Sequence, residues 1–123
     1  MNIKKSISDL IGNTPLLELT AMQKMKGLQA RVLAKLESFN PGGSAKDRPA
    51  IYMLNDAEEK GLLKEGSVII EPTSGNTGIA ISAICSAKGY KAIIVMPDSM
   101  SLERRMLMTA YGAELVLTDG KLG

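Results

Sequence analysis

The chain has 123 residues, of which 45% are hydrophobic and 23% are charged, as is usual for a single globular domain. Its 15 Lys and Arg residues exceed its 13 Asp and Glu residues by only two, and 3% of its residues are aromatic. We therefore expect no nucleic-acid partner, because such binding needs a basic surface and aromatic side chains on which bases stack.

The first residues contain two lysines, but Asp9, Gly12 and Pro15 follow before any apolar run long enough for a signal peptide or a membrane span. We therefore expect a cytoplasmic protein with no membrane contact. The sequence has no histidine, which is the commonest metal ligand and the commonest general base at neutral pH. This predicts no metal site and excludes Ser-His-Asp and Cys-His catalysis within the chain. The single cysteine, Cys85, lies in an apolar segment, which predicts a buried thiol rather than a nucleophile.

The N-terminal third contains two predicted strands. Ile11–Leu19 predicts a turn and a strand, and the sequence offers no obvious partner for that strand. Val32–Leu36 predicts a strand that leads into the Gly-rich turn Asn40–Ser44. Because strand edges without a partner are unfavourable, we expect this part to need neighbours that it does not supply itself.

A helix is predicted to begin at Lys46 and to end at Gly61. Ser44, followed three residues later by Asp47, resembles a capping box in which Asp replaces Glu. Strands and helices then alternate. The expected elements are a strand at Val68–Ile70, a turn at Thr73–Gly78, a helix to Lys88, a strand at Ala92–Met96, a helix from Ser99 or Ser101 to Tyr111, and a strand at Glu114–Leu117.

This alternation predicts the fold class. Strands joined by helical crossovers are typical of an α/β protein with a three-layer, mainly parallel twisted sheet and helices on both faces. The residues Thr118–Gly123 are turn-like, and nothing after the last predicted strand covers the sheet edge that it leaves. We therefore expect the sequence to be part of a longer protein.

Two Gly-rich turns, Asn40–Ser44 and Thr73–Gly78, each follow a predicted strand and open a helix. The carboxyl ends of parallel strands are where ligands of α/β proteins bind, and a helix N-terminus presents free N–H groups to an anion. Both turns are therefore candidate anion sites. Neither turn matches a P-loop or a Gly-x-Gly-x-x-Gly motif, which argues against a nucleotide ligand.

Lys46 stands at the start of the helix that follows the first turn. The helix dipole is unfavourable to an ammonium group there, by about 0.3–1 kcal/mol, which suits a lysine that acts as a free amine and bonds to a carbonyl compound. On the local chemistry alone, a solvated lysine steadied by Asp47 is the simpler interpretation, since exposed lysines are common. The local chemistry leaves both interpretations open.

Four segments together resemble a known family. Asn40–Arg48 and Glu71–Gly78 look like the two N-terminal motifs of cysteine synthases, the O-acetylserine sulfhydrylases. Ile11–Leu16 and Met96–Arg105 are similar to further segments of that family, and all four occur in the family's order. The likeness spans nearly the whole chain.

The resemblance implies the tryptophan-synthase-like fold and a reaction that depends on pyridoxal 5'-phosphate. It implies that Lys46 holds the cofactor covalently and moves the substrate α-proton, while acetate leaves Cβ of an O-acetylserine-like amino acid and sulfide replaces it. It further implies that Asn76 touches the cofactor ring hydroxyl and that one loop binds the substrate carboxylate, through Thr73, Ser74, Gly75, Asn76 and Thr77.

The same resemblance implies a division of the chain and several alternatives. Residues 1–36 would pack on a larger domain, and residues 37–123 would form a small, incomplete α/β domain. The family's phosphate loop and ring-nitrogen serine lie beyond residue 123, so we expect the chain alone to bind the cofactor weakly or not at all and to have no turnover. The alternatives are a cystathionine β-synthase, an O-phosphoserine sulfhydrylase, and a non-catalytic module that binds a carboxylate or the C-terminal tail of serine acetyltransferase. The resemblance also implies that the full-length family member is a homodimer.

Overall fold

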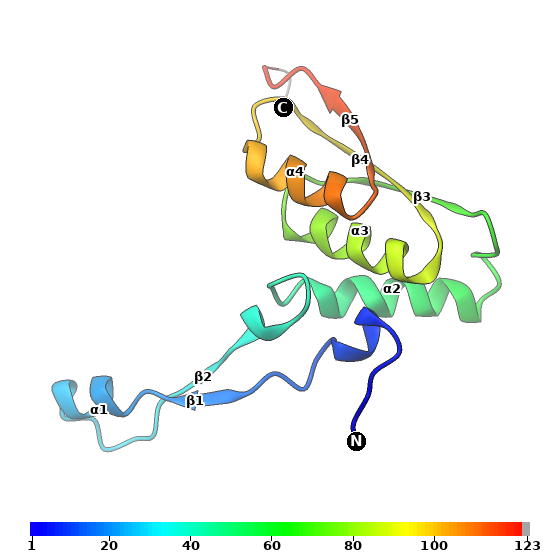
Figure 1. The fold of residues 1–123 in the computed structure, drawn as a ribbon. Helices are drawn as coiled ribbons and strands as arrows, with labels where there is room; N and C mark the ends of the chain where they lie inside the picture. Colours follow the sequence, from blue (N-terminus) through cyan, green and yellow to red (C-terminus); the bar gives the residue numbers. More distant parts are fainter. Residues whose placement is uncertain (122–123) are drawn as a thin grey trace.

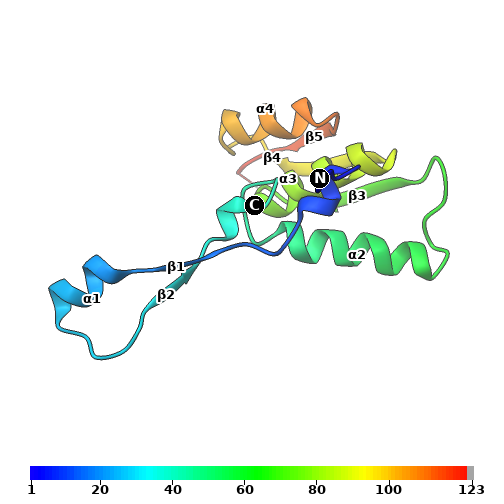
Figure 2. The ribbon, with the colours of Figure 1, turned by 60° about the horizontal axis from the view of Figure 1, so that its bottom comes forward.

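The computed structural model describes residues 1–121. An extended arm, residues 16–35, projects from a body formed by the remaining elements, and the two views agree on this arrangement (Figures 1 and 2). In chain order the elements are η1 (Ile7–Leu10), β1 (Leu16–Glu18), α1 (Thr20–Lys26), β2 (Leu33–Lys35), η2 (Glu37–Phe39), α2 (Asp47–Glu59), β3 (Val68–Pro72), α3 (Asn76–Lys88), β4 (Lys91–Pro97), α4 (Leu102–Ala110) and β5 (Glu114–Thr118).

The body contains a parallel sheet of three strands in the order β3-β4-β5. Each strand is joined to the next by a helix, as the alternation of the sequence predicts, and the mainly parallel α/β fold class is confirmed. In this register Ile70 lies beside Ile93, and Val95 lies beside Val116. These four side chains therefore share one face of the sheet.

The core lies on the other face, against α3 and α4 (Figure 1). Ala92, Ile94 and Met96 alternate along β4 and are buried there, because successive strand residues point to opposite faces. The helix α3 is apolar on nearly all sides, since it packs against β4, α4 and α2 at once. Within residues 1–121, the face opposite α3 carries exposed apolar side chains, including Val68, Ile70 and Val116.

The arm corrects one expectation from the sequence. The strand predicted within Ile11–Leu19 does have a partner, because β1 pairs antiparallel with β2, with Leu17 beside Ala34. The helix α1 connects the two strands. It was not predicted from the sequence, and it ends at Gly27, which has a left-handed conformation. Leu16, Met25 and Leu33 remain exposed on the arm, so its two strands bury little of their own apolar surface.

The predicted helix and strand boundaries in the body lie within a few residues of the observed ones. The helix predicted after Thr73–Gly78 begins at Asn76, inside the predicted turn, and ends at Gly89 with a positive φ. In the turn-like segment Thr118–Gly123, the last two residues lie outside the described part of the chain. Among residues 1–121, no helix has the length and apolar character needed to cross a bilayer.

Candidate functional site

The two candidate turns lie at the same end of the body. The helices α2 and α3 pack along each other, and both begin at the end from which the arm projects (Figures 1 and 2). One turn leads into α2 and carries Lys46, and the other leads from β3 into α3. Within the described residues, no hydrogen bond joins Lys46 to the second turn. The fold therefore places the first residues of α2 and of α3 at the same end of the body.

A cavity of about 310 Å³ opens at the carboxyl ends of the three parallel strands. This is the edge of an α/β sheet at which ligands bind. Two of the predicted substrate-binding residues, Thr73 and Ser74, line it. Its other walls come from the ends of the strands, at Pro72, Val95, Met96, Pro97 and Thr118.

The turn before α2 is held from within by buried polar side chains. Lys46 is the N-cap residue of α2, its side chain is exposed, and its N–H donates to Ser44 Oγ at 3.1 Å. The predicted capping box does not form, because Asp47 turns back and accepts from the N–H of Gly42 at 2.5 Å. Burial raises the pKa of the Asp47 carboxyl, and within residues 1–121 its second oxygen has no hydrogen-bond partner.

The position of this turn differs from the expectation in one respect. It follows β2, which belongs to the antiparallel arm and not to the parallel sheet. The start of α2 therefore lies at the same end as the start of α3 through the packing of the two helices, and not because it follows a parallel strand. The pattern of apolar residues does not distinguish the two cases, because Val32–Leu36 has the same apolar composition as a strand of either sheet.

The loop Thr73–Thr77 does follow a parallel strand. The N–H of Thr73 donates to the carbonyl of Val95 at 3.0 Å, which fixes the start of the loop to β4. Gly75 is the N-cap residue of α3 and has no side chain to cover the first N–H groups of the helix. A Cβ added at Gly75 would meet no atom within 4 Å, so the space above this helix end is open. Such an end suits a carboxylate or a phosphate.

A second glycine fixes the other side of this loop. Gly78 is buried in the first turn of α3, and a Cβ there would lie 2.9 Å from both Met108 Cε and Thr73 Cγ2 and 3.3 Å from Ile94 Cγ2. A side chain at this position would require Met108 and Thr73 to shift, so α3 approaches the sheet closely here. Gly78 thus lets the start of α3 and the loop residue Thr73 lie directly against β4 and α4.

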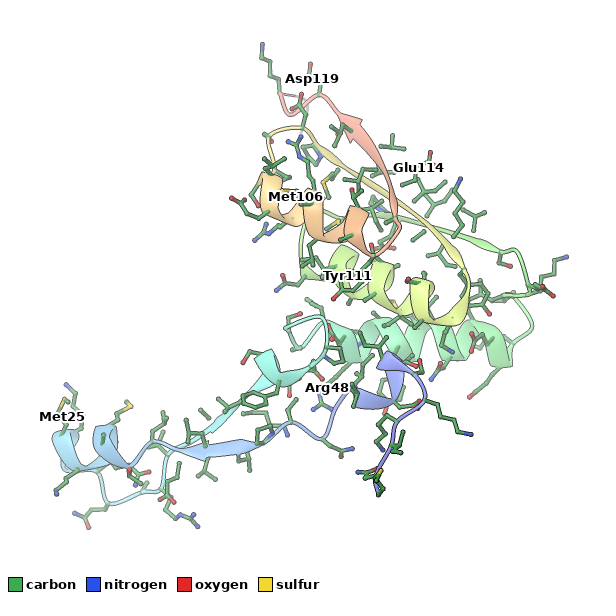
Figure 3. The ribbon with its side chains drawn as sticks, viewed as in Figure 1. Met25, Arg48, Met106, Tyr111, Glu114 and Asp119 are labelled. Atoms are coloured by element: carbon green, nitrogen blue, oxygen red, sulfur yellow. The ribbon has the colours of Figure 1, made fainter. Side chains whose placement is uncertain are left out.

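Four polar side chains that the sequence analysis did not single out connect the N-terminal segment to α2. Arg48 Nε and Nη2 donate to Glu37 Oε2 and Oε1 at 2.8 and 3.0 Å, and Thr14 Oγ1 donates to Glu37 Oε1 at 2.5 Å. Asn40 Nδ2 donates to Glu37 Oε2 at 3.0 Å. We call Thr14, Glu37, Asn40 and Arg48 the Glu37 network. Figure 3 shows Arg48 between α2 and the N-terminal segment. Thr14, Asn40 and Arg48 lie in the segments that resemble the family, but Glu37 lies in none of them.

Hydrogen bonds within this network lower the pKa of Glu37 to about 2, and the bond from Arg48 has the largest effect. Cys85, by contrast, is buried in α3 with a relative exposure of 1%, and burial raises the pKa of its thiol to about 11. A protonated thiol is not a nucleophile, so the structure agrees with the predicted inert, buried cysteine. In the described residues, no cluster of three or more His, Cys, Asp or Glu side chains could hold a metal ion.

Comparison with known proteins identifies the family. Residues 7–123 match the model of the pyridoxal-phosphate dependent enzymes. The chain belongs to this family. Two curated members are a probable cysteine synthase of Bacillus subtilis, 56% identical over 121 residues, and a cysteine synthase of a Flavobacterium, 53% identical over 115 residues. These alignments cover 98% and 94% of this chain.

Solved structures of family members have the same fold. A cysteine synthase from Entamoeba histolytica aligns with a TM-score of 0.93 at 47% identity, and an O-ureido-L-serine synthase aligns with a TM-score of 0.92 at 50% identity. Each alignment covers 99% of this chain. The chain spans 38% and 36% of the length of the two curated relatives and 37% and 38% of the two solved chains. It therefore corresponds to little more than a third of a typical family member.

Proposed function

We propose that the chain forms the N-terminal part of a cysteine synthase, which makes L-cysteine from O-acetylserine and sulfide by β-replacement with pyridoxal 5'-phosphate. In this proposal Lys46 carries the cofactor, and the loop Thr73–Thr77 binds the substrate carboxylate. The observation that carries it is the common end of α2 and α3, where an exposed lysine and an uncovered helix N-terminus share one rim. Identities of 53–56% to proteins named cysteine synthase support the choice of reaction.

The residues at the rim suit an aldehyde cofactor and an anionic substrate. Lys46 offers an exposed primary amine, and the open space above Gly75 leaves room for a carboxylate against the first N–H groups of α3. When bound, pyridoxal phosphate supplies the electron sink for a carbanion at Cα. The Lys46 amine is the base that moves the α-proton, and the hydroxyls of Thr73 and Thr77 with the amide of Asn76 orient the substrate.

A chimera tests this proposal. The aligned segment of the Bacillus subtilis relative would be replaced by this chain, and the product assayed for cofactor absorbance and for cysteine formation from O-acetylserine and sulfide. We expect both signals, and we expect Lys46→Ala to remove the lysine-bound absorbance and to lower the rate at least about 100-fold. Lys60→Ala is the matched control, since Lys60 ends the same helix and is exposed. A folded chimera without either signal, or an unaffected Lys46→Ala variant, would refute the proposal.

The 123-residue chain without the rest of a family member is expected to differ from the chimera in cofactor binding. We propose that residues 1–123 alone bind pyridoxal phosphate weakly or not at all and do not turn over, because they span only 38% and 36% of the length of the two cysteine synthases that they match. Mixing the chain with the cofactor and recording the absorbance measures this. A stable absorbance that disappears in Lys46→Ala would contradict it.

The second candidate function is a β-replacement with a nucleophile other than sulfide. The O-ureido-L-serine synthase is 50% identical to this chain and has a TM-score of 0.92, so the same N-terminal fold occurs in a relative with another product. In the chimera, replacing sulfide by hydroxyurea distinguishes the two. Product formed only with hydroxyurea would favour this candidate over cysteine synthesis.

We also propose that residues 1–36 pack on a larger domain and that residues 37–123 belong to a smaller one. The exposed Leu16, Met25 and Leu33 of the arm support this, because an arm with apolar side chains on its surface gains stability from a covering neighbour. A homodimer and docking of a serine acetyltransferase tail at the Thr73–Thr77 loop belong to the same proposal. Size-exclusion chromatography of the chimera, with and without a peptide ending in Ile, tests both.

A further inference from the structure

The geometry points to the Glu37 network as a positioning device: it fixes the first turn of α2, and with it Lys46, against the N-terminal segment Gly12–Thr14. This inference rests on the proposed function only in giving Lys46 a chemical role. Thr14, Glu37, Asn40 and Arg48 are then positioning residues, which act on the reaction through the orientation of Lys46 and do not touch the substrate.

The guanidinium of Arg48 defines the orientation of the helix start. Arg48 is the second residue of α2, two positions after Lys46. It donates from Nε and Nη2 to the two oxygens of Glu37, and Nη2 also reaches Thr14 Oγ1 at 3.2 Å. A planar guanidinium bonded to both carboxylate oxygens permits only a narrow range of orientations. The first turn of α2 is therefore fixed to η2 and to Thr14.

Asn40 connects the same N-terminal segment to both ends of the turn that carries Lys46. Its Oδ1 accepts from the N–H of Gly12 at 2.8 Å, and its Nδ2 donates to the carbonyl of Ser44 at 3.0 Å. Asn40 and Thr14 have relative exposures of 3% and 6%. Because buried polar groups without partners are costly, the turn and the N-terminal segment resist moving apart.

The arm offers a chemically similar pair without this connection. Arg31 donates from Nε and Nη2 to the two oxygens of Glu18 at 3.2 and 2.9 Å, and the Arg31 side chain is 74% exposed. This pair lies within the arm, away from α2. Arg31→Lys therefore removes the same kind of two-point bond as Arg48→Lys, but at a place that has no contact with Lys46.

Residue-resolved hydrogen exchange of the 123-residue chain tests the inference. The reporters are the amides of Gly12 and Lys46, which donate to Asn40 Oδ1 and Ser44 Oγ, and the reference is the amide of Lys60, which donates to the carbonyl of Asp56 at the far end of α2. Thr14→Val removes a hydroxyl at nearly constant volume, and Arg48→Lys removes the two-point bond. In both variants we expect exchange at Gly12 and Lys46 to accelerate about tenfold, and exchange at Lys60 to change less than about twofold.

Two further variants make the test specific. Thr14→Ser keeps the hydroxyl and is expected to restore the parental rates, and Arg31→Lys is expected to leave both reporters unchanged. Parental exchange at Gly12 and Lys46 in both Thr14→Val and Arg48→Lys would overturn the inference, as would equal acceleration at Lys60 or a failure of Thr14→Ser to restore the rates. The measurement needs no cofactor, so an inactive chimera would refute the proposed function and leave this result standing.

Discussion

The contact between Gly42 and Asp47 permits a quantitative prediction about the turn that carries Lys46. A Cβ at Gly42 would lie 2.5 Å from Asp47 Oδ1 and 3.0 Å from both Cγ and Oδ2. Asp47 cannot simply move aside, because its Oδ2 accepts from the N–H of Gly42 and its side chain is buried, with a relative exposure of 2%. Gly42→Ala must therefore break this hydrogen bond or displace the turn.

The magnitude follows from three effects. Loss of a hydrogen bond to a charged acceptor costs about 1.5–3 kcal/mol. Replacing glycine by alanine lowers the entropy of the unfolded chain, which raises the free energy of unfolding by about 0.4–1 kcal/mol. Burial already raises the pKa of Asp47, so a carboxylate pushed toward water recovers part of its desolvation cost. We expect Gly42→Ala to lower the free energy of unfolding by about 1–2 kcal/mol.

Urea unfolding followed by circular dichroism at 222 nm measures this, since the chain has no tryptophan. Gly75→Ala is the matched control, because a Cβ there meets no atom within 4 Å, and we expect a change of at most about 0.5 kcal/mol. In an Asp47→Ala background the clash is gone, so Gly42→Ala should become neutral or slightly stabilising. An equal loss in both backgrounds, or no loss in the parent, would refute the reasoning.

Three further predictions concern charges and the thiol. The pKa of Glu37 is lowered from 4.5 to about 2, so the ionised Glu37 carboxylate should stabilise the fold fully above about pH 4.5 and lose this effect as the pH falls through 2. The difference in unfolding free energy between the parent and Glu37→Gln should therefore shrink over that range. A difference that stays constant with pH would contradict this prediction. Lys88 Nζ contacts Glu58 at 2.7 Å with both side chains partly buried, whereas the Asp56–Lys60 pair is 59% and 61% exposed. Glu58→Gln should therefore lower the unfolding free energy by roughly 1 kcal/mol and Asp56→Asn by less than about 0.5 kcal/mol; equal effects would show that burial does not decide their strength. Cys85 should resist a thiol-specific reagent at pH 8 in the folded chain and react at once in urea, because it is buried and the pKa of its thiol is about 11; fast labelling of the folded chain would contradict the buried position.

The body of the fold was predictable because its signals are local. Apolar runs of strand length, each followed by a helix that ends at a glycine such as Gly89, specify parallel crossovers without any knowledge of distant contacts. The apolar α3 was predictable for the same reason, although its exact start was not. Asn76 begins α3 inside the predicted turn, because Gly75 rather than a Ser or Thr occupies the N-cap position.

The arm and the site network were less predictable because they depend on distant pairs. The strand β1 has only three residues, and its partner β2 begins 15 residues after β1 ends, so no periodicity links them. Asp47 fits a capping-box pattern, yet in the fold it reaches back to Gly42, a choice that depends on the close approach of the turn. Glu37 resembles any exposed acidic residue until Thr14 and Arg48 are placed beside it.

The four motifs that resemble cysteine synthases form two physical units. Ile11–Leu16 and Asn40–Arg48 are one unit, because Gly12 bonds to Asn40 and both Thr14 and Arg48 bond to Glu37. Glu71–Gly78 and Met96–Arg105 adjoin through the hydrogen bond from Thr73 to β4 and the cavity wall formed by Ser74 and Met96. Within residues 1–121, α2 packs on α3 and η1 also contacts α3, and we expect the packing of this helix pair to set the separation of Lys46 from the loop Thr73–Thr77. A substitution that shifts α2 along α3 should therefore impair the proposed site even though it lies outside all four motifs.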